Sequence, residues 1–211
     1  MEVEVKNKNK LGQKQRNLVR LAQFFYEVGT MRKMARIHRQ VLFTDDMSDN
    51  IATHSFRAAF IGFMLAKMAG ANPFKVMAMC LLHDMGEART NDHNWIHKRY
   101  VKSDDTLVLE EQLGALPFDD LAELAREYER RESLEALLAK DADVLDQVLL
   151  LREYEHQGNK EAPRWLRGKR RKGLYHQKYC TTVWGKKLGD AICAEDPADW
   201  WSQVYTNKRR K

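Results

Sequence analysis

The stretch Leu81–Asp92, "LLHDMGEARTND", carries the pattern on which the fold and the chemistry of this chain depend. A strongly apolar run, predicted to be a short buried helix over residues 74–87, reaches His83 and Asp84 and then Glu87, and Asp92 follows. On a helix, His83 and Glu87 lie one turn apart, so these side chains converge. A buried carboxylate without a partner costs free energy, and a divalent cation is one natural partner. The stretch therefore predicts a polar centre at the end of a buried helix.

Helical patterns continue on both sides of this stretch. Apolar residues recur at helical spacing over residues 14–43, with Gly29 as a break, and the polar run 44–50 offers N-caps for a long helix over residues 51–68. "GANP" (Gly70–Pro73) ends that helix and begins the next. The remaining segments are predicted as a short helix or irregular segment at 93–101, helices near 105–115, 118–129 and 132–156, a polar basic loop at 157–173, and closing helices at 174–190 and 196–206. The prediction is an all-α, compact helical bundle.

Composition supports one packed domain. The chain has 211 residues, 44% of them apolar and only four of them proline, which suits a single helical core. We expect a flexible arm at residues 1–13, the folded domain at 14–206 and a basic tail at 207–211. The three cysteines are far apart and form no C-x-x-C pair, which favours a reducing compartment. No leader sequence and no membrane span is visible, so the sequence predicts a soluble, cytoplasmic protein.

The net charge of +6 is concentrated in three places, namely residues 6–10, 164–173 and 207–211. A basic excess attracts phosphate groups, whether on a nucleic acid or on a small nucleotide. The basic loop at 164–172 therefore leaves open a nucleic-acid partner. The plainer interpretation, which we favour, is a solvated loop and a solvated tail.

Further candidate metal ligands lie on two other predicted helices. His54 is early in helix 51–68, and helix 132–156 has apolar residues on both sides of three carboxylates, Asp141, Asp143 and Asp146. Two His and two Asp from three helices form a mixed nitrogen and oxygen set that suits Mn, Fe, Co, Ni or Zn. Without a metal, His83 and Asp84 would be a satisfied polar cluster at a helix end.

The ordered set "THS…LLHDMGE…AKDADVLDQ" resembles the HD-domain metal-dependent phosphohydrolase superfamily. The spacing H-D-x-x-E-x-x-x-x-D from His83 to Asp92 is similar to its 5′-deoxyribonucleotidase branch, and the similarity covers about residues 20–160. The resemblance implies an HD-type helical domain, a homodimer, and one divalent ion (Mn, Co, Fe, Ni, Zn or Mg) held by His54, His83, Asp84 and Asp143. The chain departs from that branch where Thr53 replaces a usual Glu and Ile37 a usual Trp.

The resemblance also implies roles for the remaining site residues. Glu87 would position or deprotonate a water, and Asp92 would protonate the departing sugar oxygen or orient the water with Glu87. "MRKMARIHR" (Met31–Arg39) resembles the segment in which that branch places a phosphate-binding arginine, which would be Arg36. Lys98 would add a second phosphate contact. The predicted enzyme releases inorganic phosphate from nucleoside or deoxynucleoside 5′-monophosphates.

Alternatives accompany each prediction. The chain could be an HD-type phosphohydrolase of nucleoside triphosphates, cyclic nucleotides or guanosine polyphosphates, or a non-catalytic basic module that binds nucleic acid or a partner. Glu87 could be a solvent-facing helix residue, Asp92 an N-cap and Arg36 a surface residue. His93 and His97 could mark a second metal, although two exposed histidines are favoured. The Met and Phe residues over 56–79 are predicted to be core.

Overall fold

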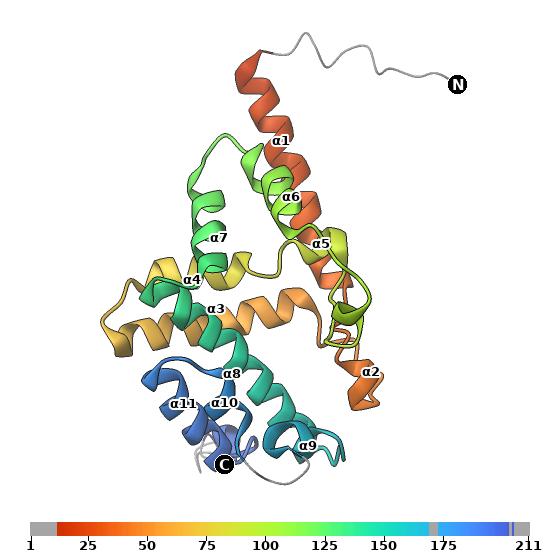
Figure 1. The fold of residues 1–211 in the computed structure, drawn as a ribbon, viewed down its shortest axis with the longest axis vertical. Coiled ribbons are helices and arrows are strands. Elements are labelled where there is room, and N and C mark those ends of the chain that lie inside the picture. The colour runs from red at the N-terminus through yellow and green to blue at the C-terminus, as the bar shows by residue number, and fades with distance from the viewer. Residues whose placement is uncertain (1–11, 169–172, 203, 205–211) are drawn as a thin grey trace, which may run out of the picture.

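In the part of the chain that the computed structural model describes, residues 12–168, 173–202 and 204, the regular secondary structure is helical, apart from a single bridge between Ala35 and Asn50 (Figure 1). The all-α prediction is confirmed. The predicted arm at residues 1–13 and the basic tail at 207–211 lie almost wholly outside the described residues. The elements, in chain order, are α1 (Gln13–Val28), η2 (Gly29–Lys33), α2 (Arg39–Leu42), α3 (Ile51–Ala69), α4 (Pro73–Leu82), α5 (Glu87–Thr90), η3 (His97–Arg99), α6 (Asp105–Leu109), η4 (Glu110–Gly114), α7 (Asp120–Arg130), α8 (Leu134–His156), α9 (Ala162–Arg167), α10 (Tyr175–Tyr179), α11 (Val183–Ala194) and α12 (Asp199–Ser202).

Helices α3 and α4 begin and end where the local sequence predicts. The Asn50 side chain accepts the amide of Thr53 at 3.1 Å and closes a capping box at the start of α3. Gly70 ends α3 in the left-handed region at φ +71°, which favours glycine. The Asn72 side chain then caps α4, and Pro73 occupies its first turn.

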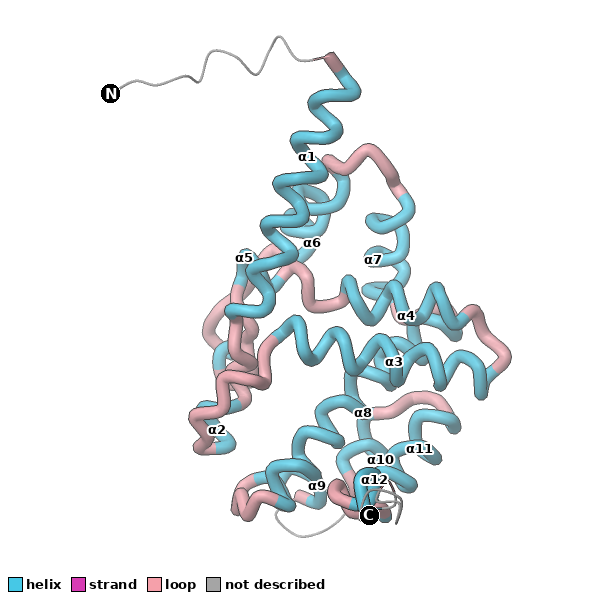
Figure 2. The backbone as a smooth tube through the Cα atoms, turned by 180° about the vertical axis from the view of Figure 1, so that it is seen from behind, coloured by secondary structure: helices cyan, strands magenta, loops and turns pink. Residues whose placement is uncertain are grey.

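Helix α8 lies at the centre of the molecule and packs against α3, α4, α7, α9, α10 and α11. Its inward residues Leu138 and Leu145 join Leu65 and Met79 in the main core, and each such side chain contributes about 1.5–3 kcal/mol on burial. Figure 2 shows α3 and α4 side by side above α8. Because α3, α8 and the turn that directly follows α4 carry the predicted ligands, the core itself fixes the site.

The predicted helix over residues 74–87 is interrupted. Helix α4 ends at Leu82, tighter turns follow in which Met85 donates to Leu82 (3.0 Å) and Glu87 to Asp84 (3.1 Å), and Glu87 begins α5. The His83 ring contributes to the break, because its Nδ1 lies 2.7 Å from the carbonyl of Cys80, the group that would accept the next helical amide. Glu87 is therefore not one α-turn from His83 on a continuous helix.

Two further predictions of local structure are wrong. The predicted loop at 157–173 contains α9, which begins where the Asn159 side chain accepts the amides of Glu161 and Ala162. The predicted helix at 174–190 is divided between α10 and α11. The division follows from Asp141, whose carboxylate accepts both backbone amides at residues 181–182 and so holds that segment out of the helix.

The expectation that the Met and Phe residues over 56–79 are core is also wrong for one face of α3. Phe56, Phe60 and Met64 are 63%, 57% and 55% exposed and follow one another at helical spacing. The opposite face of α3 approaches its neighbours through small residues, and a Cβ at Gly62 would lie 2.7 Å from the sulfur of Cys80. Large side chains are therefore left outside. We call Phe56, Phe60 and Met64 the α3 stripe.

None of the helices that the structure describes is both long enough and apolar enough to cross a membrane.

Candidate metal centre

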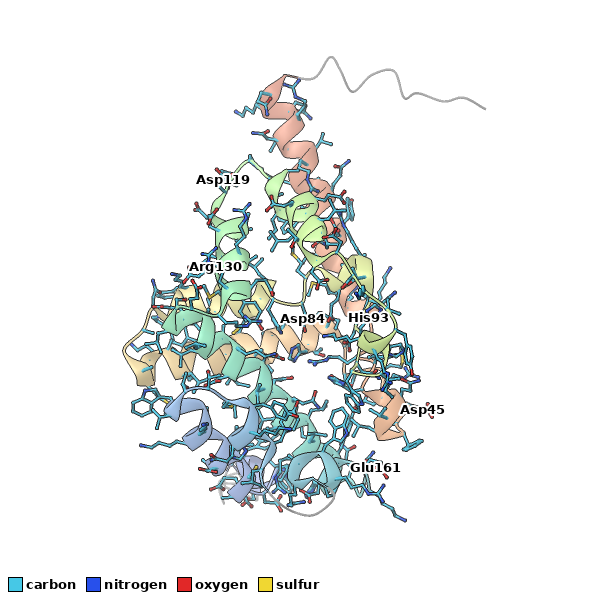
Figure 3. All side chains as sticks on the ribbon, viewed as in Figure 1. Asp45, Asp84, His93, Asp119, Arg130 and Glu161 are labelled. Carbon is cyan, nitrogen blue, oxygen red and sulfur yellow. The ribbon has the colours of Figure 1, made fainter. Side chains whose placement is uncertain are left out.

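Four predicted ligands meet between three segments of the fold. His54 comes from α3, His83 from the end of α4, Asp84 from the turn after it and Asp143 from α8; Figure 3 labels Asp84 in the middle of the molecule. His54 Nε2 lies 3.1 Å from His83 Nε2, and 3.3 Å from both Asp84 Oδ2 and Asp143 Oδ1. His83 Nε2 lies 3.2 Å from Asp84 Oδ2. Ligand atoms that each lie about 2.1 Å from one ion are separated by about 3.0–3.5 Å, so the spacing fits a bound cation.

The hydrogen bonds around the centre leave lone pairs pointing inward. His83 Nδ1 faces the carbonyl of Cys80 at 2.7 Å, and His54 Nδ1 faces the carboxylate of Asp146 at 2.5 Å. Both partners are acceptors, so both Nδ1 atoms carry the proton and both Nε2 atoms present lone pairs. Two such nitrogens and two carboxylate oxygens repel one another unless a cation or protons lie between them. The residues therefore fit a divalent metal.

Ionisation of the metal-free centre follows from the same crowding. Burial alone would lower the pKa of His83, but the Asp84 and Asp143 carboxylates outweigh it and raise that pKa to about 9. Burial opposes ionisation of Asp84 as well, yet His83 and His54 hold its pKa well below the ordinary range. Protons thus take the place of the cation, and a metal would have to displace them.

The three aspartates of α8 have three different surroundings. Asp143 faces the centre, and its second oxygen accepts from Lys140 at 2.6 Å. Asp146 is 2% exposed and joins His54 to Arg57, whose Nε donates at 2.5 Å. Asp141 accepts the backbone amides of Thr181 and Thr182, which precede α11, and does not join the centre. The structure therefore brings Asp143, of the three candidates, into the centre, and shows that Asp146 orients the His54 ring, a contact the sequence did not reveal.

Glu87 and Asp92 lie beside the centre in different environments. Burial, together with the Asp84 and Asp92 carboxylates, raises the pKa of Glu87 to about 10, and its Oε2 is buried without a hydrogen-bond partner. The Asp92 carboxylate accepts the backbone amide of Ile37 at 2.7 Å and lies 3.9 Å from Arg36 Nε. Asp92 therefore fixes the segment that carries Arg36.

Arg36 is buried, at 7% exposed, and is not a surface residue. Burial opposes its charge, but the Asp84, Asp143 and Asp92 carboxylates raise its pKa, so the guanidinium stays protonated. Its Nε and Nη1 atoms are buried without hydrogen-bond partners. A charged group with two unused donors beside a metal centre is suited to an oxyanion. Lys98 is exposed, and its charge acts on Glu87 by opposing the rise of that pKa.

His38 belongs to the site and was missed by sequence reasoning. Its Nε2 lies 2.9 Å from Arg36 Nη2, and its ring meets Trp165 edge-on at 5.4 Å between centroids. Burial and the Arg36 guanidinium lower the pKa of His38 to about 3, so the ring is neutral. A lone histidine in the basic run "RIHR" gives no local signal of such a role.

The other candidates lie outside the centre. The rings of His93 and His97 stack at 5.9 Å, and His97 Nδ1 bonds to Asn94 at 2.9 Å. In the part of the chain that the structure describes, the metal-like grouping of His and carboxylate is that of His54, His83 and Asp143. In the basic loop at 164–172, Arg164 and Arg167 form ion pairs with Glu161 and Glu155, while residues 169–172 lie outside the described residues.

Comparison with known proteins identifies a family and several similar proteins. A family model described as an HD domain matches residues 31–177, which is more than half of the chain. The 5′-deoxynucleotidase HDDC2 of Dictyostelium discoideum is 29% identical over 125 residues, which are 53% of this chain and 66% of that protein. The Homo sapiens protein of the same name is 29% identical over 144 residues, 64% of this chain and 68% of that protein.

A solved structure from Magnetospirillum magnetotacticum, described as a predicted metal-dependent phosphohydrolase, shares the fold. It superposes with a TM-score of 0.64 over 86% of this chain and 93% of that chain, at 22% identity. The curated relatives are matched over about two thirds of their own length.

Proposed function

This chain belongs to the HD domain family, and we propose that within this family it is a metal-dependent phosphomonoesterase that releases inorganic phosphate from nucleoside or deoxynucleoside 5′-monophosphates. The observation that carries the proposal is the buried Arg36, whose unused donors lie beside a centre suited to a divalent cation. The names of the two HDDC2 relatives support the nucleotide substrate.

In this proposal His54, His83, Asp84 and Asp143 hold one divalent ion, which is Mn, Co, Fe, Ni, Zn or Mg. Such an ion polarises a phosphate oxygen and lowers the pKa of a bound water. Asp146 and the Cys80 carbonyl fix the two histidine rings with their Nε2 lone pairs inward.

Glu87 and Asp92 are proposed to move protons. Glu87 holds a proton in the metal-free site because of burial and the neighbouring carboxylates, and added positive charge would favour its carboxylate form. It could then orient or deprotonate the attacking water. Asp92 would protonate the departing sugar oxygen, or orient the water together with Glu87.

Arg36 is proposed to bind the phosphate through its unpartnered Nε and Nη1 atoms. The fork of a guanidinium matches two phosphate oxygens, and the Asp92 bond to the Ile37 amide keeps this segment in place. Lys98 would add a second, solvent-exposed contact. We also propose that the protein forms a homodimer, for which the exposed α3 stripe is a suitable surface.

The test is phosphate release after chelation, with Mn, Co, Ni, Zn or Mg restored, from a panel of deoxy and ribo 5′-monophosphates. We expect metal-dependent release that His83→Ala abolishes and that Glu87→Gln lowers by about 10²–10⁴-fold. Asp119→Asn is the matched control, because Asp119 is exposed and makes no capping bond at the start of α7.

Arg36→Lys keeps the charge and loses the fork, so its kcat/KM should fall while metal affinity stays unchanged. Folded protein that releases no phosphate from any monophosphate with any of these metals would contradict the proposal. Release from triphosphates, cyclic nucleotides or guanosine polyphosphates instead would place the chain elsewhere among HD-type phosphohydrolases.

A further inference from the structure

Two side chains near the centre, the half-buried His38 and the buried Gln147, have buried polar atoms that no group of the described structure satisfies. The unpartnered atoms are His38 Nδ1 and both amide atoms of Gln147, which is 4% exposed. Buried polar groups are nearly always hydrogen-bonded, so each exception calls for a ligand, a water or a functional role. Neither residue is among the proposed ligands or the proton-moving groups.

The contact between His38 and Arg36 fixes which nitrogen of the imidazole carries the proton. A guanidinium can only donate, so His38 Nε2, 2.9 Å from Arg36 Nη2, must be the acceptor. A neutral ring that accepts at Nε2 carries its proton at Nδ1. The unpartnered Nδ1 is therefore a buried N–H donor, and Trp165 packs against the ring and holds its orientation.

Gln147 and His38 each lie along the chain between a residue at the metal centre and a residue of one buried apolar cluster. Along residues 36–42, the charge of Arg36 interacts with the Asp143 carboxylate, and Leu42 belongs to the same buried cluster as Leu151 while its carbonyl accepts from Asn159 at 2.6 Å. Along α8, Gln147 lies one turn after Asp143 and one turn before Leu151, on the same face. Along their own segments, both residues therefore lie between the metal centre and the buried cluster that contains Leu42 and Leu151.

We propose that His38 and Gln147 form a subsite for a sugar hydroxyl of the nucleotide whose phosphate Arg36 binds. The inference rests on the proposed function and names the part of the substrate that this pair recognises. A hydroxyl accepts two hydrogen bonds and donates one. The pair offers two N–H donors and one amide oxygen, and either orientation of the Gln147 amide gives that set because neither of its atoms has a partner. A phosphate oxygen would instead leave the amide oxygen facing negative charge.

The experiment compares substrates that differ only in the hydroxyl. The substrates are a 2′-deoxynucleoside 5′-monophosphate, its 2′,3′-dideoxy counterpart and 4-nitrophenyl phosphate, which has no sugar. Wild type should lose at least about tenfold in kcat/KM from the deoxy to the dideoxy substrate, because a polar pair is left unpaired. Gln147→Leu and His38→Phe should each lower kcat/KM on the deoxy substrate by about tenfold relative to wild type. On the dideoxy substrate, each variant should have nearly the same kcat/KM as wild type.

Gln147→Leu should hydrolyse 4-nitrophenyl phosphate at the wild-type rate to within about twofold, since it lacks only a neutral hydrogen bond to a sugar. His38→Phe also loses the bond to Arg36 Nη2, so its loss on the nucleotides is compared with its own rate on the aryl phosphate. Gln23→Leu on the exposed surface of α1 is the matched control. His38→Gln, which restores an N–H donor, should recover part of the loss and serves if His38→Phe does not fold. An equal loss on the aryl phosphate, or a wild type that treats both nucleotides alike, would overturn the subsite.

Failure of the proposed function can be told apart from failure of the subsite. If no phosphomonoester is hydrolysed, calorimetry of 2′-deoxyadenosine against 2′,3′-dideoxyadenosine decides the matter. Tighter binding of the deoxynucleoside that disappears in Gln147→Leu supports the subsite without any catalysis. Equal or absent binding of the two nucleosides rejects it.

Discussion

Among single residues, Asp146 should have a clear effect on the metal centre, because it orients the His54 ring through Nδ1, the nitrogen that faces away from the centre. The carboxylate accepts from His54 Nδ1 and from Arg57 Nε at 2.5 Å each. In Asp146→Asn the amide can turn its NH₂ toward His54 and favour the wrong imidazole tautomer, so metal affinity should fall by about 10–100-fold. Competition with a chromophoric chelator measures this loss. Asp119→Asn should show no loss, and an unchanged affinity in Asp146→Asn would contradict the assigned role.

The raised pKa values of His83 and Glu87 predict how stability depends on pH. The pKa of His83 rises from 6.5 to about 9, so its contribution to folding stability is complete below pH 6.5 and is lost as pH rises through 9. The pKa of Glu87 rises from 4.5 to about 10. Because this group ionises at lower pH in the unfolded chain than in the folded one, it too lowers the stability as pH rises between these values. The Tm of metal-free protein should therefore decrease between about pH 6.5 and 9.

Metal binding should have the opposite dependence, because the ligands must lose their protons. The difference in Tm between metal-loaded and metal-free protein should widen over the same pH range, as thermal denaturation monitored by circular dichroism would show. His83→Asn should flatten the metal-free curve. A metal-free Tm that rises with pH, or a difference that narrows, would contradict this account.

Helix α8 carries one aspartate, Asp141, that should affect stability alone, and another, Asp146, that should affect metal affinity. The Asp141 carboxylate accepts the amides of Thr181 and Thr182 at 2.7 and 2.9 Å and both hydroxyls of those residues. Asp141→Ala should lower the free energy of unfolding of metal-free protein by about 2–4 kcal/mol, since these are bonds to a charged acceptor. Urea denaturation measures this change. Metal affinity should be unaltered, unlike in Asp146→Asn. A stability equal to that of Asp119→Ala would refute the role of Asp141 in holding the segment before α11.

The three helices around the centre, α3, α4 and α8, show how far the sequence can predict the site. Signals that act locally, such as the Asn50 and Asn72 caps and Gly70, set the bounds of α3 and α4 and were predictable. Three aspartates on one helix could not be told apart by residue type, because the helices that pack on each face decide their roles. The family pattern indicated Asp143, but nothing local indicated that Asp146 orients His54. His38 was missed for the same reason, since its burial comes from α9, which the sequence presented as a polar loop.

For the whole molecule, the α3 stripe predicts association. Phe56 and Phe60 meet edge-on at 5.1 Å, and a face of large apolar side chains is unusual on a monomer. Wild type should sediment as a dimer, and Phe60→Glu should sediment as a monomer with unchanged metal affinity. Phe118→Glu is the matched control, because Phe118 is similarly exposed, at 63% against 57% for Phe60, but lies away from the stripe. A monomeric wild type at micromolar concentration, or dimeric Phe60→Glu, would contradict the homodimer.

The turn at residues 83–86 is the part of the metal centre that should open most readily. It carries two proposed ligands and is held by short-range bonds from Met85 and Glu87 and by one longer-range bond, from Gln112 to the Met85 carbonyl at 3.3 Å, whereas His54 and Asp143 sit inside long helices. The turn can open locally while α3 and α8 stay folded, but only after a bound cation has left. Amide hydrogen exchange at Met85 and Glu87 should therefore slow on adding metal, with little change at Leu145. In the loaded protein, the rate of cation dissociation would set how often this turn opens.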